Sequence, residues 1–102
     1  MPFQKVCEAH QLPQGSRKHV ERNGREYMLI NSVRDGLFCI DHRCPHAAGA
    51  VGDGLIMGKN ITCPLHKWRF SLTDGAHVHK GTRNLGVYAI KVEGNDVLID
   101  VV

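Results

Sequence analysis

The sequence predicts an all-β protein: one antiparallel β-sandwich or barrel with a loop-rich segment inserted into it. Turn signals are frequent along the 102 residues, helical periodicity is poor, and short runs rich in Val, Ile, Leu and Tyr lie between the turns. Such runs are typical of strands, and their regular spacing is typical of a sandwich or barrel. The length suits one compact domain, residues 1–102, rather than two.

Turn dipeptides divide the chain into its expected strands. Phe3–Cys7 is a candidate for the first strand. Asn23-Gly24, Asp35-Gly36 and Gly94-Asn95 then each separate two strand-like runs, which predicts three hairpins. The paired runs are Arg17–Arg22 with Arg25–Asn31, Tyr27–Val33 with Leu37–Asp41, and Val87–Val92 with Val97–Val102.

The middle of the chain, from His42 to Gly75, has a different character. Seven Pro and Gly residues punctuate it, and its apolar stretches, such as Leu55–Met57 and Asn60–Cys63, are brief. We therefore expect a subdomain of loops and short strands over residues 42–75, inserted within the β framework. A loop-rich segment of this length needs a group that orders it or a function that explains it.

Composition and charge exclude several classes of protein. With 42% hydrophobic and 23% charged residues, the chain has an ordinary globular composition. The net charge of +3 comes from dispersed basic residues with no run of four, so no nucleic-acid surface is expected. The sequence shows no signal peptide and no apolar run of membrane-spanning length, so we expect a cytoplasmic protein without a membrane partner. Four Cys in a reducing compartment favour metal binding or burial over disulfides.

Two metal-ligand pairs lie in the loop-rich segment. The first is Cys44-Pro45-His46 and the second is Cys63-Pro64-Leu65-His66, with sixteen residues between His46 and Cys63. Each pair can place a thiolate and an imidazole on one tight loop, which the proline stiffens. Two such loops facing each other would supply two sulfur and two nitrogen ligands.

Three interpretations of this donor set remain open on the residues alone. A tetrahedral zinc site accepts two Cys and two His, but zinc fingers pair Cys with Cys and His with His along the chain. A [2Fe–2S] cluster in which two His replace two Cys on one iron suits the mixed order better, because each loop then gives one ligand to each iron. The third interpretation is coincidence, with buried Cys and surface His.

The segments 44–49 and 63–70, closed by Thr73-Asp74-Gly75, resemble the two cluster-binding boxes of Rieske proteins. Asp53–Ile56 is similar to the linker of that family, and Leu85–Val101 to its closing hairpin. The resemblance implies a Rieske-type iron–sulfur fold with one [2Fe–2S] cluster per chain. It implies that Cys44 and Cys63 bind the buried iron, whereas His46 and His66 bind the outer iron close to solvent.

The departures from the family pattern bear on the reduction potential. High-potential respiratory members carry an additional Cys in each box, at the positions of Gly49 and Leu65 here, so no bridge can form. They also place Ser and Tyr hydroxyls near the cluster sulfurs, where this sequence aligns Trp68 and Phe70. Hydrogen bonds to sulfur raise the potential, so their absence predicts a value of roughly −150 mV, at the low end of the Rieske range.

The resemblance implies an electron carrier without catalytic residues of its own. We expect neither the mononuclear iron domain of a Rieske oxygenase, for which 102 residues leave no room, nor the membrane anchor of a respiratory subunit. In the family, freestanding carriers pass electrons from a flavin-dependent reductase to a terminal oxygenase, and we expect a monomer in isolation. The alternative is the small subunit of an assimilatory nitrite reductase, which Arg69–Gly75 resembles; a structural zinc-binding module is a third class.

The other Cys and His residues are expected to serve no chemistry. Cys39 lies in a strand-like run and is expected in the core, and Cys7, at the end of the first strand, is expected to be buried or simply a free thiol. His10 and His19 are expected at the surface, and for His42 a role beside the metal is the less favoured interpretation. His77, His79 and Lys67 are expected in solvent, although the two His have the spacing of an adventitious metal site.

Overall fold

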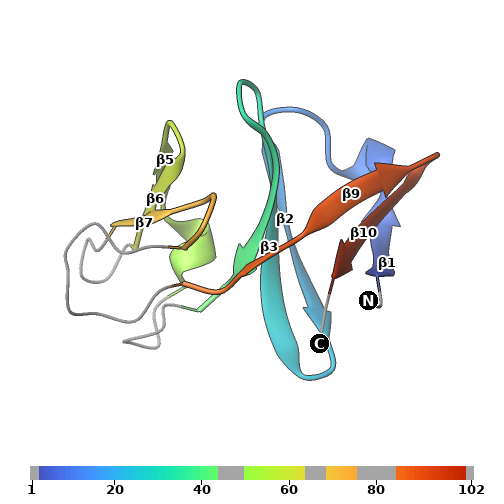
Figure 1. The fold of residues 1–102 in the computed structure, drawn as a ribbon, viewed down its shortest axis with the longest axis horizontal. Coiled ribbons are helices and arrows are strands. Elements are labelled where there is room, and N and C mark those ends of the chain that lie inside the picture. The colour runs from blue at the N-terminus through green and yellow to red at the C-terminus, as the bar shows by residue number, and fades with distance from the viewer. Residues whose placement is uncertain (1–2, 44–49, 64–68, 76–84, 101–102) are drawn as a thin grey trace.

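The computed structural model describes residues 3–43, 50–63, 69–75 and 85–100, which form antiparallel sheets arranged in layers (Figure 1). Within these ranges it has ten strands and two short 3-10 helices, η1 (Ala9–Gln11) and η2 (Val51–Asp53). The strands are β1 (Phe3–Glu8), β2 (Ser16–Arg22), β3 (Arg25–Ser32), β4 (Gly36–Asp41), β5 (Leu55–Met57), β6 (Asn60–Thr62), β7 (Arg69–Ser71), β8 (Val87–Tyr88), β9 (Ile90–Glu93) and β10 (Asp96–Asp100). The predicted all-β class is confirmed.

Three sheets make up the fold. Their strand orders are β1-β10-β9, β2-β3-β4-β8 and β5-β6-β7. The β2-β3-β4-β8 sheet, the central sheet, lies in the middle of the molecule (Figure 1). The β1-β10-β9 sheet, the outer sheet, lies at one end, and the β5-β6-β7 sheet, the small sheet, lies at the other. Among the described residues, the structure contains no helix with the length and apolar character that crossing a membrane requires.

The hairpin at Asn23-Gly24 has the predicted two-residue turn. Asn23 and Gly24 have φ values of 55° and 79°, and Arg22 pairs with Arg25 across the turn. Positive φ at both central residues is the conformation that lets a turn follow the right-handed twist of its strands, and Asn-Gly adopts it at low cost. The hairpin of β3 and β4 and that of β9 and β10 also form where the sequence predicted them.

One expected strand is divided between two sheets. Val87–Val92 was predicted as a continuous strand, but β8 pairs with β4 in the central sheet, whereas β9 pairs with β10 in the outer sheet. Ala89 lies between them, and its carbonyl accepts a hydrogen bond from the Asp100 amide at 3.0 Å. The chain therefore crosses from one sheet to the next at this residue, which a pattern of apolar residues alone does not reveal.

Strand β3 is the centre of the molecule because it is buried on both faces. Tyr27, Met28, Leu29 and Ile30 are all buried, and successive residues of a strand point to opposite faces. Tyr27 and Leu29 therefore join the core shared with β1 and β10, whereas Met28 and Ile30 join a second core shared with β6 and β7. The second core comprises Met28, Ile30, Ile40, Val51, Ile61, Cys63, Phe70, Leu72 and Leu85.

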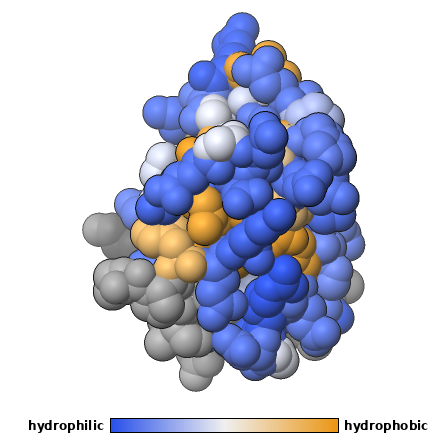
Figure 2. Space-filling model, turned by 90° about the vertical axis from the view of Figure 1, so that its right-hand side faces the viewer, coloured by the Kyte–Doolittle hydropathy of each residue, from blue (hydrophilic) through white to orange (hydrophobic). Residues whose placement is uncertain are grey.

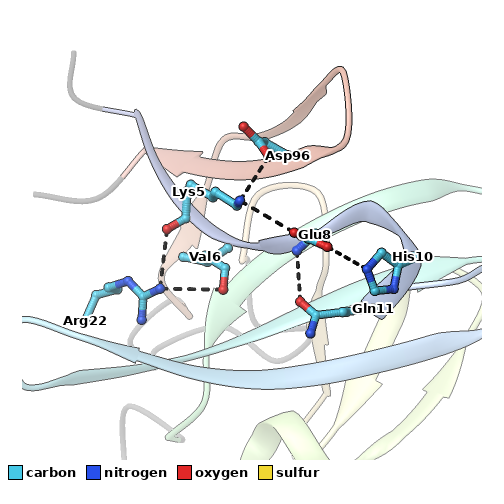
Figure 3. A network of polar contacts seen from close by, with 7 residues as sticks. All are labelled: Lys5, Val6, Glu8, His10, Gln11, Arg22 and Asp96. Atoms are coloured by element: carbon cyan, nitrogen blue, oxygen red, sulfur yellow. Dashed lines mark hydrogen bonds and ion pairs between the residues drawn. The ribbon is translucent and has the colours of Figure 1, made fainter.

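A polar network ties β1 to β2 and β10 (Figure 3). Lys5 pairs with Asp96 of β10 at 3.1 Å, and Arg22 of β2 donates hydrogen bonds to the carbonyl oxygens of Lys5 and Val6. His10, on η1, is 73% exposed and pairs with Glu8, as expected for a surface residue. Exposed pairs of this kind contribute little to stability.

Viewed from the side of β1, β9 and β10, the surface is mostly hydrophilic with a hydrophobic area across its middle (Figure 2).

Candidate cluster-binding site

Of the four predicted ligands, the structure describes Cys63. Its side chain is fully buried, directly after β6, within the second core. Cys44, His46 and His66 lie outside the described residues, as do Trp68, Lys67, His77 and His79. Besides Cys63, the described part of the site consists of the segments that begin and end the two predicted loops.

The first loop, residues 44–49, is closed at its base by backbone pairing. Arg43 and Ala50 form an antiparallel bridge, so the chain enters and leaves this loop side by side. The Gly52 amide also donates to the carbonyl of His42 at 3.1 Å, which holds η2 against the end of β4. The loop that carries Cys44 and His46 thus starts from a fixed point on the central sheet.

The second loop, residues 63–68, is closed in the same manner. Thr62 of β6 pairs with Arg69 of β7, directly before and after the loop. Phe70, on β7, is fully buried in the second core. The loop that carries Cys63 and His66 is therefore the connection of a short hairpin whose inner face is apolar.

The bases of the two loops pack against each other. Val51 of η2 and Ile61 of β6 are both fully buried in the second core with Cys63. At Gly54 the two backbones come so close that a Cβ atom would overlap the carbonyl oxygen of Thr62 and lie 2.8 Å from its carbonyl carbon. Gly54 has an ordinary φ of −73°, so backbone conformation does not require glycine here. Glycine is required because there is no room for a Cβ atom.

Arg17 connects the central sheet to this region, a role that sequence reasoning missed. Its Nη1 donates hydrogen bonds of 2.8 Å to the carbonyl oxygens of Gly52 and Gly54. In the sequence it is one of many dispersed basic residues, and no local pattern distinguishes it. Because charged donors form stronger hydrogen bonds than neutral ones, Arg17 fixes η2 to β2 across 35 positions of the chain.

We expect Arg17→Gln to destabilise the segment after the first loop. The substitution removes two charge-assisted hydrogen bonds, and loss of such bonds costs about 1.5–3 kcal/mol. The measurement is the urea midpoint of unfolding, compared with that of Arg34→Gln, an exposed arginine on the turn before β4. Equal midpoints for the two variants would contradict the role of Arg17.

A second set of side chains fixes the end of β4. The Tyr88 hydroxyl donates to Oδ1 of Asp41 at 2.8 Å, and Nη2 of Arg25 donates to that hydroxyl at 3.0 Å. Burial, followed by the hydrogen bond to Asp41, raises the pKa of Tyr88 well above its usual value, so the phenol stays protonated and able to donate. Asp41 thus binds a tyrosine that is 47 positions away in the chain.

His42 is buried two residues before Cys44. It is 7% exposed, and its ring lies 4.4 Å, centroid to centroid, from that of His19. Burial, followed by the charge of His19, lowers the pKa of His42. His19 is 45% exposed, in agreement with the expected surface position.

The two remaining cysteines are core residues, as predicted. Cys39 is fully buried and Cys7 is 5% exposed. Burial raises the pKa of Cys39 to about 12 and also raises that of Cys7, so both thiols stay protonated at neutral pH. Both residues therefore pack as apolar side chains in the first core, with Tyr27 and Leu29.

Comparison with known proteins shows which family this chain resembles. The family model described as "Rieske [2Fe-2S] domain" matches residues 2–89. The ferredoxin component of the naphthalene 1,2-dioxygenase system of Pseudomonas aeruginosa is 35% identical over 92 residues, which cover 89% of this chain and 88% of the relative.

Solved structures agree with this match. The structure described as "Complex of reduced oxygenase and oxidized ferredoxin in carbazole 1,9a- dioxygenase" superposes with a TM-score of 0.81 at 26% identity, covering 95% of this chain and 91% of that one. A putative NADH-dependent nitrite reductase small subunit from Mycobacterium tuberculosis superposes with a TM-score of 0.84 at 18% identity, covering 99% and 96%. The latter likeness shows a common fold.

Proposed function

Because this chain belongs to the Rieske [2Fe-2S] domain family, we propose that it is the ferredoxin of a ring-hydroxylating dioxygenase system, carrying one electron at a time to a terminal oxygenase. The observation that carries this proposal is the match to a dioxygenase ferredoxin component along nearly the full length of both chains. The chain is an electron carrier and not itself an enzyme.

The four proposed ligands of the [2Fe–2S] cluster are Cys44, His46, Cys63 and His66, with one cluster per chain. Two thiolates and two imidazoles are the donor set of Rieske centres. Cys63 fits this assignment, because its side chain is buried against apolar residues and its thiol is not part of a disulfide. When bound, the cluster accepts and releases a single electron.

The residues around the loops hold the ligands and exclude water. The bridge of Arg43 with Ala50 and the pairing of Thr62 with Arg69 fix the ends of both ligand loops. The apolar second core lies beneath Cys63, and a hydrophobic shell around a metal site controls solvent access and potential. We propose that residues 42–75 form the cluster-binding subdomain within the single domain 1–102.

The proposed partners follow from the relatives. One similar structure is that of a ferredoxin in complex with its oxygenase, which supports a terminal oxygenase as the electron acceptor of this chain. A flavin-dependent reductase is the proposed donor, and we propose a cytoplasmic protein that is a monomer in isolation. The nitrite reductase subunit is the second candidate, supported by the similarity of fold.

Reconstitution of electron transfer tests the proposed function. A purified aromatic-ring dioxygenase system from which its own ferredoxin is omitted should form hydroxylated product again when this protein is added. The matched experiment supplies the large subunit of a nitrite reductase and measures nitrite consumption. Activity with the nitrite reductase and none with any dioxygenase system would reverse the order of the two candidates.

We expect a reduction potential of roughly −150 mV, at the low end of the Rieske range. The resemblance to the Rieske boxes puts Trp68 and Phe70 at the positions of the hydroxyl-bearing residues of high-potential members, and neither side chain can donate an O–H hydrogen bond to cluster sulfur. The measurement is a potentiometric titration followed by absorption. A midpoint above roughly +100 mV would contradict this reasoning.

A further inference from the structure

Three side chains outside the proposed cluster ligands converge on one face of the central sheet. His19 lies on β2, Glu26 on β3, and His42 directly after β4. His19 pairs with Met28, two residues from Glu26, so His19 and Glu26 are diagonal neighbours on one face. The His42 amide donates to the Glu26 carbonyl at 3.1 Å, which places His42 opposite Glu26 on the next strand.

The distances among these side chains are those of a metal site that is nearly formed. Nε2 of His19 and Oε1 of Glu26 are 3.1 Å apart, and a ring nitrogen of His42 joins them with all three donor atoms within 4.8 Å of one another. Ligands at 2.0–2.2 Å around one Zn²⁺ ion lie about 3–3.5 Å apart. The first two donors therefore already have the required separation, and the third lies within 4.8 Å of both.

Neighbouring groups hold the donors in place. Nε of Arg43 donates to Oε2 of Glu26 at 2.8 Å, which leaves Oε1 facing His19. Such outer partners commonly orient the ligands of metal sites. The His42 ring packs against Gly52, where a Cβ atom would overlap it, and its buried Nδ1 has no hydrogen-bond partner among the described residues.

The site is open on one side and closed on the other. The side chain of His19 is 45% exposed and that of Glu26 is 28% exposed, whereas His42 is 7% exposed. An ion can thus enter from solvent past His19 and keep a water molecule as a further ligand. The lowered pKa of Glu26, caused first by its hydrogen bond with Arg43, keeps the carboxylate charged.

We propose that His19, Glu26 and His42 form a mononuclear site for a divalent transition-metal ion such as Zn²⁺, in addition to the cluster. Two imidazoles and one carboxylate are a donor set that Zn²⁺ accepts, with an open position for water. An ion bound there joins β2, β3 and the start of the first ligand loop. The site therefore links the central sheet to the segment that leads into Cys44.

Calorimetric titration of the cluster-loaded protein with Zn²⁺ tests this site. We expect one saturable site per chain, while the visible absorption of the cluster stays unchanged and so excludes exchange at the cluster ligands. His19→Gln and Glu26→Gln, two substitutions at exposed or half-exposed positions, should each weaken binding by at least the 10–100-fold that loss of an outer partner typically costs. Zn²⁺ should raise the unfolding temperature of the unchanged protein and not that of these variants.

Matched variants separate this site from adventitious binding. His10→Gln removes an exposed His that pairs with a single carboxylate, and the double variant His77→Gln, His79→Gln removes the other candidate His pair. Both should bind Zn²⁺ as the unchanged protein does. The proposal is overturned if no saturable binding occurs below about 1 mM Zn²⁺, or if His19→Gln and Glu26→Gln bind as tightly as the unchanged protein.

Discussion

The variant His66→Ala is expected to lose the visible absorption of the cluster and all electron transfer. Alanine offers no ligand atom, so one iron would lack a protein donor at a position that lies within the second predicted box. The loop also loses its tie to the metal, and metal binding contributes directly to the folding of small metal-binding domains. The measurement is iron and sulfide content after anaerobic purification, together with dioxygenase activity in the reconstituted system.

The exposed histidine His10 provides the matched control for His66. Its side chain is 73% exposed and pairs with Glu8 at the surface, so His10→Ala should keep full cluster content and activity. His66→Cys should retain a cluster of lower potential, because a thiolate donates more charge to iron than a neutral imidazole. Full electron transfer by His66→Ala would show that the ligand assignment is wrong.

The second large effect is expected from Gly54→Ala. A Cβ atom at this position overlaps the Thr62 carbonyl oxygen and lies 3.0 Å from that of Val51, and backbone groups cannot rotate away as side chains do. Overpacking costs about 1–3 kcal/mol, occasionally more, and contact with backbone places this site at the upper end. About 3 kcal/mol corresponds to a fall of roughly 12–24 °C in the unfolding temperature of a domain of this size.

Gly58→Ala is the control for Gly54→Ala, because it separates the effect of steric overlap from the effect of backbone conformation. Gly58 has a φ of 60° and open space where a Cβ atom would be, whereas Gly54 has an ordinary φ and no space. Gly58→Ala should therefore cost only the left-handed backbone penalty of about 1–2 kcal/mol and retain the cluster. If Gly54→Ala unfolded at the same temperature as the unchanged protein, the two loop bases would not be packed as described.

Much of the fold follows from local patterns in the sequence. The turn at Asn23-Gly24 and the short strands at Leu55–Met57 and Asn60–Thr62 could be predicted because their signals lie within a few residues. The division of Val87–Val92 between two sheets could not, because it depends on which distant strand each half meets.

The candidate site, like the fold, could be predicted from the sequence only in part. Each Cys-His pair, Cys44 with His46 and Cys63 with His66, is a local signal, and the resemblance of the two pairs to the Rieske boxes is what predicts the cluster. Arg17 and Gly54 were missed as contributors, because each acts on a segment that is distant in sequence. Arg17 is recognised by its two carbonyl partners and Gly54 by the approach of Thr62, and both facts depend on the three-dimensional arrangement of the chain.

Electron paramagnetic resonance of the reduced protein, with analysis of iron and acid-labile sulfide, tests the central claim most directly. We predict a reddish-brown protein with two irons and two sulfides per chain and a signal that appears on one-electron reduction. A protein that stays colourless after anaerobic reconstitution, contains no sulfide and binds stoichiometric zinc would contradict the account.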